Sequence, residues 1–237
     1  MDEISVSQEK EAESRCDKQN ASSKNLSSEL LQRQGFRLDI KKSSIKHVFA
    51  GDGVWLMGRA DVGKVIAMVP GEFYVPEQHK YIPGYPSLGR DADYMISRFD
   101  GTIIDPRRWM KMYRNESDEF APTIFSGVQM SNPLSYGHMI NHPSRGIKSN
   151  VVPASFTIKE SELGDLRRFI PLAHGQVPDA KSSEKSRLLG VAMIALRPLE
   201  DEELFLNYRL NPSCLQGLPE WYCPINEEED SRRWTIS

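Results

Sequence analysis

Short apolar runs separated by glycines fill residues 47–74, and they constrain the fold more than any other feature of the sequence. Val48-Phe49-Ala50 precedes Val54-Trp55-Leu56-Met57, and Val65-Ile66-Ala67-Met68-Val69 then ends at Pro70-Gly71. Apolar runs this short, bounded by turn residues, are typical of β-strands and not of helices. The segment therefore predicts a meander of short strands.

A β-hairpin is predicted farther along, between Tyr94 and Asp105. Apolar residues lie on both sides of Asp100-Gly101, and Asp-Gly favours the tight turn that joins antiparallel strands. Residues 154–158 predict another strand, which leads into a short helix over residues 160–168. The sequence thus predicts an α+β fold that is mainly β.

The flanks of this region differ in composition. Residues 1–25 contain almost no large apolar side chain and are predicted to form a disordered tail. Residues 26–46 are expected to begin with a helix, because leucines follow a capping serine and Gly35 closes the pattern. The main domain is predicted over residues 47–210, followed by an aromatic and acidic tail over residues 211–237. Loops are predicted at residues 83–91, 107–118 and 173–187.

Composition excludes several classes of protein. The chain has 237 residues and a formal net charge of −3, so it lacks the basic field that non-specific nucleic-acid binding needs. No apolar run approaches the length of a membrane span, and the N-terminus has no apolar signal segment. Cys16, Cys214 and Cys223 show no CxxC spacing, so neither a disulfide framework nor a metal site is predicted. We expect an intracellular protein, cytoplasmic or nuclear, with no nucleic-acid or membrane partner.

Candidate binding residues occur in two places. Residues 132–150 contain Ile140-Asn141-His142, whose amide and imidazole can hydrogen-bond the edge and exocyclic amine of a purine. Gly51-Asp52-Gly53 lets the backbone turn sharply and approach a ligand without an intervening Cβ. The structural alternatives are a polar turn after a buried strand for the first and a tight turn between strands for the second.

The order of these features resembles the SET-domain family of S-adenosylmethionine-dependent protein methyltransferases. The resemblance rests on Gly51-Asp52-Gly53 followed by Val54, the Tyr94 strand with its Asp-Gly hairpin, Ile140-Asn141-His142, and Glu202-Glu203-Leu204 closed by Tyr208. It covers about residues 30–210. Within the family, the sequence looks closest to the SET domain-containing protein 9 branch.

The resemblance implies a particular fold. SET domains are built from small, β-clip-like sheets, and two of their C-terminal segments thread past one another in a knot-like arrangement. In this chain those segments would be Asn141-His142 and residues 203–208. True threading is rare in proteins, so this topology is implied by the family and not by the pattern of the residues.

The resemblance also implies an activity, protein-lysine N-methylation, with S-adenosylmethionine as cofactor and a protein substrate that presents a lysine side chain. Tyr208 would be the catalytic tyrosine, and Tyr94 would line the lysine channel. The cofactor would be held by Gly51, Asp52, Gly53, Val54, Asn141, His142 and Tyr208. The alternative for Tyr208 is a core tyrosine with a satisfied hydroxyl.

The chemistry explains these residue types. Methyl transfer from a sulfonium to an amine is an in-line displacement, so the protein must mainly align the reactants and exclude water. The lysine, with an ordinary pKa of about 10.4, must first lose its proton, which an apolar channel favours. A tyrosine hydroxyl can polarise the approach, and the reaction needs no metal.

The sequence also departs from the family pattern. His138 stands where an arginine is usual, Asn207 where an aspartate is common, and the zinc-binding cysteine cluster is missing, so no zinc is predicted. Trp221 and Tyr222 in the C-terminal tail could form a lid over the site or pack on the domain surface. A second function therefore stays open, that of a SET-fold binding module without catalytic activity.

Overall fold

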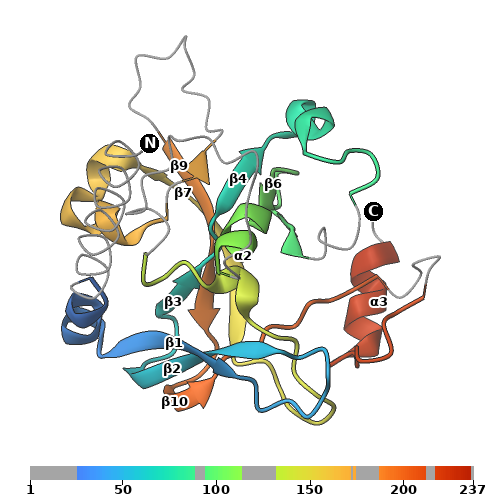
Figure 1. The fold of residues 1–237 in the computed structure, drawn as a ribbon, viewed down its shortest axis with the longest axis horizontal. Coiled ribbons are helices and arrows are strands. Elements are labelled where there is room, and N and C mark those ends of the chain that lie inside the picture. The colour runs from blue at the N-terminus through green and yellow to red at the C-terminus, as the bar shows by residue number, and fades with distance from the viewer. Residues whose placement is uncertain are drawn as a thin grey trace, which may run out of the picture.

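Three small β-sheets form the body of the protein in the computed structural model, which describes residues 26–88, 94–113, 132–171, 173–174, 187–211 and 217–235 (Figure 1). Neighbouring strands are antiparallel except for the pair β4 and β8. The prediction of a mainly β, α+β fold is confirmed. Within the described residues, no helix is long and apolar enough to cross a membrane.

The first sheet has the order β1 (Phe36–Lys42), β2 (Asp52–Ala60) and β10 (Leu199–Glu203). Strand β1 alternates apolar and polar residues, which places Phe36 and Leu38 in the core while Arg37 and Asp39 form an ion pair across their partly exposed face. Strand β2 continues directly from Gly51, so Asp52 and Gly53 belong to a strand.

The second sheet has the order β3 (Val65–Met68), β9 (Arg187–Ala195) and β7 (Val151–Lys159). Central strand β9 is an almost continuous apolar run, as expected for a strand with neighbours on both edges. The third sheet has the order β5 (Ile96–Ser97), β6 (Ile103–Asp105), β4 (Gly71–Tyr74) and β8 (Ala173–His174). Its β5–β6 hairpin turns at Asp100-Gly101, as predicted.

Helices are short and lie around the sheets. Residues 26–34 are helical and end at Gly35, whose φ of 84° is the left-handed conformation that a glycine cap provides. The α-helices α2 (Arg107–Tyr113) and α3 (Glu227–Thr235) follow later in the chain. The 3₁₀ helices are η1 (Pro76–Tyr81), η4 (Gly137–Met139), η5 (Glu160–Glu162) and η6 (Gly164–Phe169).

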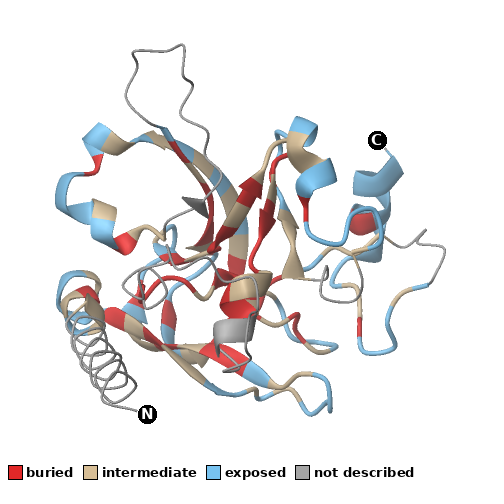
Figure 2. Ribbon diagram, turned by 45° about the horizontal axis from the view of Figure 1, so that its top comes forward, coloured by how far each residue is buried: buried red, intermediate tan, exposed pale blue. Residues whose placement is uncertain are grey.

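A single core joins the three sheets. Buried side chains come from all of them, and they concentrate in the centre of the molecule where the sheets meet (Figure 2). The largest fully buried side chains include Phe36, Leu56, Ile66, Ile104, Ile140, Met193, Leu199 and Leu204. Ile140 belongs to the Ile140-Asn141-His142 segment, and Leu204 belongs to the segment that ends at Tyr208. The core therefore fixes the positions of both segments.

Several local predictions were wrong. Residues 48–50 form a turn and not a strand, because Val48 and Phe49 lie at the exposed end of the β1–β2 connection. Residues 107–113 form helix α2 and not a loop, and this helix buries Trp109 and Met110. The short helix predicted over residues 160–168 is present as the 3₁₀ helices η5 and η6. Part of the C-terminal tail is helix α3. The predicted disordered tail lies outside the described residues.

Arg98 ties the third sheet to the second. Its side chain is fully buried, donates to the carbonyls of Phe156 (2.8 Å) and Gly190 (2.6 Å), and pairs with Asp100 at 3.1 Å. A buried guanidinium is tolerated because each of its edges has a partner. Loss of the side chain would leave two buried carbonyls without this donor.

We predict that Arg98→Met lowers the free energy of unfolding by about 2–4 kcal/mol, since buried polar groups lose their partners. Urea denaturation measures the change. Arg59→Met is the matched control, because Arg59 pairs with Glu200 on the exposed surface and its loss should alter stability little. Equal effects of the two substitutions would contradict the role assigned to Arg98.

Candidate functional site

Two segments separated by about sixty residues lie side by side at the edge of the core. Residues 205–206 form parallel bridges with Asn141 and with Val151. Leu206 N–H donates to the Asn141 carbonyl at 2.9 Å, whereas the Phe205 carbonyl accepts from Asn150 N–H at 3.0 Å. Because consecutive residues of an extended chain direct their backbone groups to opposite edges, residues 205–206 run between the two ends of the 141–151 loop.

Asn150 fixes this crossing. It is 1% exposed, and its side-chain oxygen accepts from Phe205 N–H at 2.7 Å while its side-chain nitrogen donates to the Glu203 carbonyl at 2.8 Å. The same nitrogen reaches a Glu202 carboxylate oxygen at 3.0 Å. The Asn150 amide therefore provides hydrogen-bond partners for the Phe205 N–H and the Glu203 carbonyl, which a neighbouring strand would otherwise provide.

Glu203 is a buried carboxylate, 3% exposed, beside the crossing. It accepts hydrogen bonds from the hydroxyl of Ser43 (2.7 Å) and from both the backbone N–H (2.7 Å) and the hydroxyl (2.6 Å) of Ser44. A buried charge requires such donors, and these three come from the β1–β2 connection. Glu203 thus fastens that connection to the segment that leads to Tyr208.

Asn141 fastens the other end of the same connection. Its side-chain nitrogen donates to the carbonyls of Ala50 (3.2 Å) and Asp52 (3.1 Å), and it lies 3.5 Å from Glu203 Oε1. The structure therefore brings Asn141 next to Gly51-Asp52-Gly53, and the family resemblance implies one cofactor site for these residues. We call Asn141, His142, Glu203, Tyr208 and the Ala50–Gly53 backbone the crossing cluster.

The two glycines in the cluster have different roles. Gly51 has a φ of 57°, and a Cβ there would meet nothing within 4 Å, so the backbone is open on that side. A Cβ on Gly53 would lie 2.0 Å from Glu203 Oε1. Gly51 therefore leaves room for a ligand, whereas Gly53 makes room for the Glu203 carboxylate.

His142 uses both ring nitrogens within the protein. Nδ1 accepts from Tyr208 N–H at 3.3 Å, and Nε2 donates to the Cys223 carbonyl at 2.8 Å, which requires the neutral ring. Burial lowers the pKa of His142, with smaller opposing contributions from its hydrogen bonds. Any contact of His142 with a ligand would therefore use its backbone.

Tyr208 lies across the cluster. Its hydroxyl donates to the Ile140 carbonyl at 3.0 Å, and its side chain is 36% exposed. The next residue, Arg209, has a φ of 49°, a left-handed conformation that is uncommon for a residue with a side chain. The tyrosine is thus held at a backbone bend with its ring reaching back toward residues 140–142.

The C-terminal segment packs on the cluster, which the sequence left open as one of two alternatives. Tyr222 stacks on His142 with ring centroids 4.4 Å apart, and Trp221 meets Tyr208 edge-on at 6.1 Å. Helix α3 holds this segment in place, since Trp234 Nε1 donates to the Arg209 carbonyl at 3.0 Å. Residues 217–235 therefore form one wall beside Tyr208.

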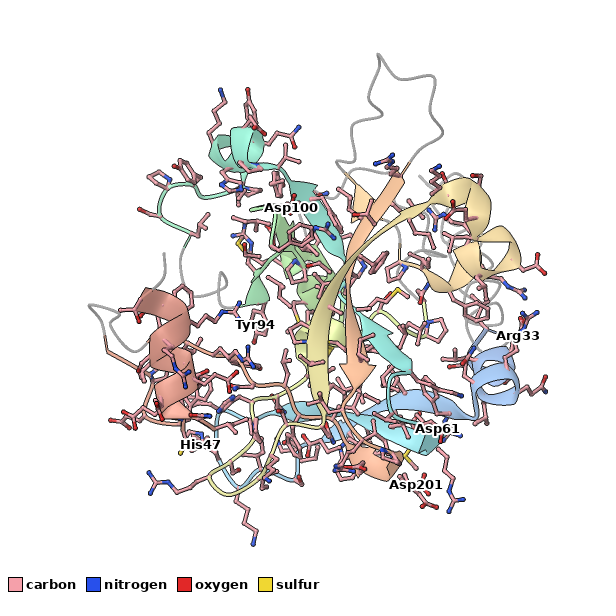
Figure 3. All side chains as sticks on the ribbon, turned by 180° about the vertical axis from the view of Figure 1, so that it is seen from behind. Arg33, His47, Asp61, Tyr94, Asp100 and Asp201 are labelled. Atoms are coloured by element: carbon pink, nitrogen blue, oxygen red, sulfur yellow. The ribbon has the colours of Figure 1, made fainter. Side chains whose placement is uncertain are left out.

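Val54 and Tyr94 are the two remaining predicted site residues. Val54 is fully buried in β2, where its carbonyl accepts from Leu204 N–H at 2.8 Å. Tyr94 lies just before β5, on the same side of the molecule as helix α3 (Figure 3). Its assignment to a lysine channel stays a prediction. In the part of the chain that the structure describes, no group of His, Cys, Asp or Glu side chains could hold a metal ion.

His138, which stands at the position of the family arginine, is buried in helix η4. It is 7% exposed, and neither ring nitrogen has a hydrogen-bond partner. Burial lowers its pKa to about 3. The imidazole is therefore neutral and serves as a packing residue.

No protein-family model matches the sequence, and no curated protein matches it. Among solved structures 73 chains match, and one is a crystal structure of a Plasmodium falciparum protein described as a "putative histone methyltransferase". The match covers 73% of this chain and 96% of that chain, with 15% sequence identity and a TM-score of 0.36. A similarity this low assigns neither fold nor activity.

We predict that Gly53→Ala destabilises the protein by about 1–3 kcal/mol, because the new methyl group must displace Glu203. In a Glu203→Ala background the same substitution should cost much less, and a double-mutant cycle measures this coupling. Gly51→Ala is the matched control. It should cost about 1 kcal/mol from left-handed strain in either background, and coupling as large as that of Gly53 would contradict our assignment.

We predict that His138 makes the fold sensitive to acid. Its folded pKa is lower than the unfolded value, so its contribution is fully present above pH 6.5 and is lost as pH falls toward about 3. Between pH 7 and 4.5 the loss should be about 2–3 kcal/mol.

Urea denaturation at the two pH values measures this loss, and His138→Phe should lack it. His47→Gln, at an exposed histidine, should keep the acid sensitivity of the parent protein. A His138→Phe variant with the full parental loss would show that other groups cause it.

Proposed function

We propose that this chain is an S-adenosylmethionine-dependent protein-lysine N-methyltransferase of the SET-domain type. The observation that carries the proposal is the crossing itself. Residues 205–206 run between the ends of the 141–151 loop, and this passage brings Tyr208 against residues 140–142. This is the arrangement that a threaded SET fold requires.

The groups around Gly51 suit a ligand with cationic centres such as the sulfonium and ammonium of S-adenosylmethionine. The backbone is open at Gly51, the carbonyls of Ala50 and Asp52 flank it and accept from Asn141, and the Glu203 carboxylate lies beside Gly53. Asn141 would orient these carbonyls. When bound, the cofactor would supply an electrophilic methyl group.

Tyr208 has the geometry of a group that orients an incoming amine. Its hydroxyl donates to the Ile140 carbonyl, which holds the phenolic oxygen beside residues 140–142, and a phenolic oxygen is a group that can make weak CH···O contacts. Trp221 packs edge-on against the Tyr208 ring and covers part of this side of it. A drier environment favours the neutral lysine amine, which is the nucleophile.

The alternative is a SET-fold module that binds a partner or the cofactor without turnover. Two observations favour this alternative. The Glu203 carboxylate fills the space beside Gly53, and both ring nitrogens of His142 bond groups within the protein. Calorimetry with S-adenosylmethionine, followed by transfer of a labelled methyl group to mixed cellular proteins, separates the two. Binding without transfer would favour the module. Absence of binding would contradict both the methyltransferase and a module that binds the cofactor.

We predict that Tyr208→Phe lowers kcat/KM for methyl transfer by about 10²-fold or more, with cofactor affinity largely retained. The ring still packs on Trp221, and only a hydroxyl that acts in the transition state is lost. Labelled-methyl transfer to a substrate that the parent modifies measures the effect.

Tyr74→Phe is the matched control, since it removes a hydroxyl that bonds Glu72 outside the cluster and should leave transfer intact. Circular dichroism of each variant checks the fold. Full activity of a folded Tyr208→Phe variant would make Tyr208 a core residue and would contradict the proposed mechanism.

A further inference from the structure

Two loops at one corner of the protein expose apolar side chains beside lysines. The first is the β1–β2 connection, residues 43–51, and the second comprises residues 143–149. Asn141 joins them, because it precedes the second loop and its side chain bonds the end of the first at Ala50. We call this region the basic corner, and its members are Lys42, Lys46, Val48, Phe49, Ile147 and Lys148.

The apolar residues of the basic corner face water. Val48 is 83% exposed, Phe49 is 77% exposed and Ile147 is 43% exposed. Phe49 N–H donates to His47 Nδ1 at 3.3 Å, and the two rings lie 5.4 Å apart. The turn is therefore held by its own contacts while Val48 and Phe49 remain outside the core. Side chains this exposed contribute little to folding, and adjacent exposed apolar residues commonly mark an interaction site.

Basic residues predominate in the two loops, although the exposed Asp52 lies opposite Lys42 in the β1–β2 pairing. Residues 40–50 and 143–149 contain no acidic residue, although the whole chain has a net charge of −3. Within the described residues, no ion pair involves Lys42, Lys46 or Lys148. His47 marks this corner in Figure 3, where nitrogen-tipped side chains extend away from the body of the protein. The corner is thus a local cationic surface on an acidic protein.

The first loop is held firmly at its base. Ser43 and Ser44 bond Glu203, and Ala50 bonds Asn141, so both ends of the connection are anchored. A short loop with fixed ends limits the positions that the exposed Val48 and Phe49 can take. Little ordering is then needed when this surface meets a partner.

We propose that the basic corner docks the protein on anionic lipid membranes. Val48 and Phe49 would enter the boundary between headgroups and acyl chains, and the lysines would lie at the anionic headgroups. The exposed turn favours this partner, because a loop end can enter a lipid interface without a preformed groove. A nucleic acid would pair with the lysines but would gain little from Val48 and Ile147. Interfacial contact needs no membrane-spanning helix, so it revises only the expectation that the protein has no membrane partner.

Vesicle flotation tests the proposal with the complete chain. The parent protein should bind anionic vesicles, made of phosphatidylcholine mixed with phosphatidylserine. Its affinity for vesicles of phosphatidylcholine alone should be at least about tenfold lower, and salt should release it from the anionic vesicles. Val48→Ser/Phe49→Ser should weaken binding to anionic vesicles by about tenfold or more. Lys42→Gln/Lys46→Gln should weaken it by about 25-fold, or about fivefold for each lysine.

Phe99→Ser is the matched control. Phe99 is 84% exposed at the tip of the β5–β6 hairpin, but its neighbour is Asp100, so its loss should not alter vesicle binding. Melting temperatures show that each variant is folded. Absence of parent binding, or equal losses from Phe99→Ser and the Val48/Phe49 variant, would overturn the proposal. The proposal would also be overturned if the protein bound an acidic peptide or DNA through Phe49 and did not bind vesicles.

Discussion

The buried amide of Asn150 is the interaction on which the rest of the structure depends. Residues 205–206 cannot form an ordinary sheet between the ends of the 141–151 loop, because the pairing there consists of isolated bridges. Asn150 supplies the missing partners for Phe205 N–H and the Glu203 carbonyl from inside the core. Without that amide, buried backbone groups would lack hydrogen bonds, at a cost of about 1–3 kcal/mol for each. The position of Tyr208 follows from this constraint.

Glu203 extends the constraint to the surface. A buried carboxylate is costly unless donors surround it, and its donors are Ser43 and Ser44 at the base of the β1–β2 connection. The same carboxylate occupies the space beside Gly53 and approaches Asn141. The candidate site and the basic corner therefore share one anchor. A substitution at Glu203 would disturb both, so it cannot be used to separate their functions.

Local patterns predicted the elements that depend on local forces. The Asp100-Gly101 turn and the strands around residues 54–57 and 65–68 follow from turn chemistry and short apolar runs. Strand β1 could have been found too, since Phe36, Leu38 and Ile40 alternate with charged residues. Helix α3 has a recognisable cap, because Asn226 accepts from Glu229 N–H. In contrast, Val48 and Phe49 are apolar but lie outside the core in an exposed turn, so the apolar run wrongly predicted a strand there. The bond between Ser43 and Glu203 joins residues 160 positions apart, and no local pattern contains it.

His142 shows how the candidate site combines structural and chemical roles. Its neutral ring accepts from Tyr208 N–H on one side and donates to Cys223 on the other, so it links the crossing to the C-terminal segment. Both contacts require the Nε2–H tautomer, and burial, by lowering the pKa of His142, favours the neutral form. Tyr222 stacks on the same ring and thereby places Trp221 beside Tyr208. The sequence of Asn141 and His142 suggested purine recognition, but in the structure the two residues have different roles. Asn141 bonds the carbonyls on either side of Gly51. His142 links Tyr208 to the C-terminal segment that packs beside it.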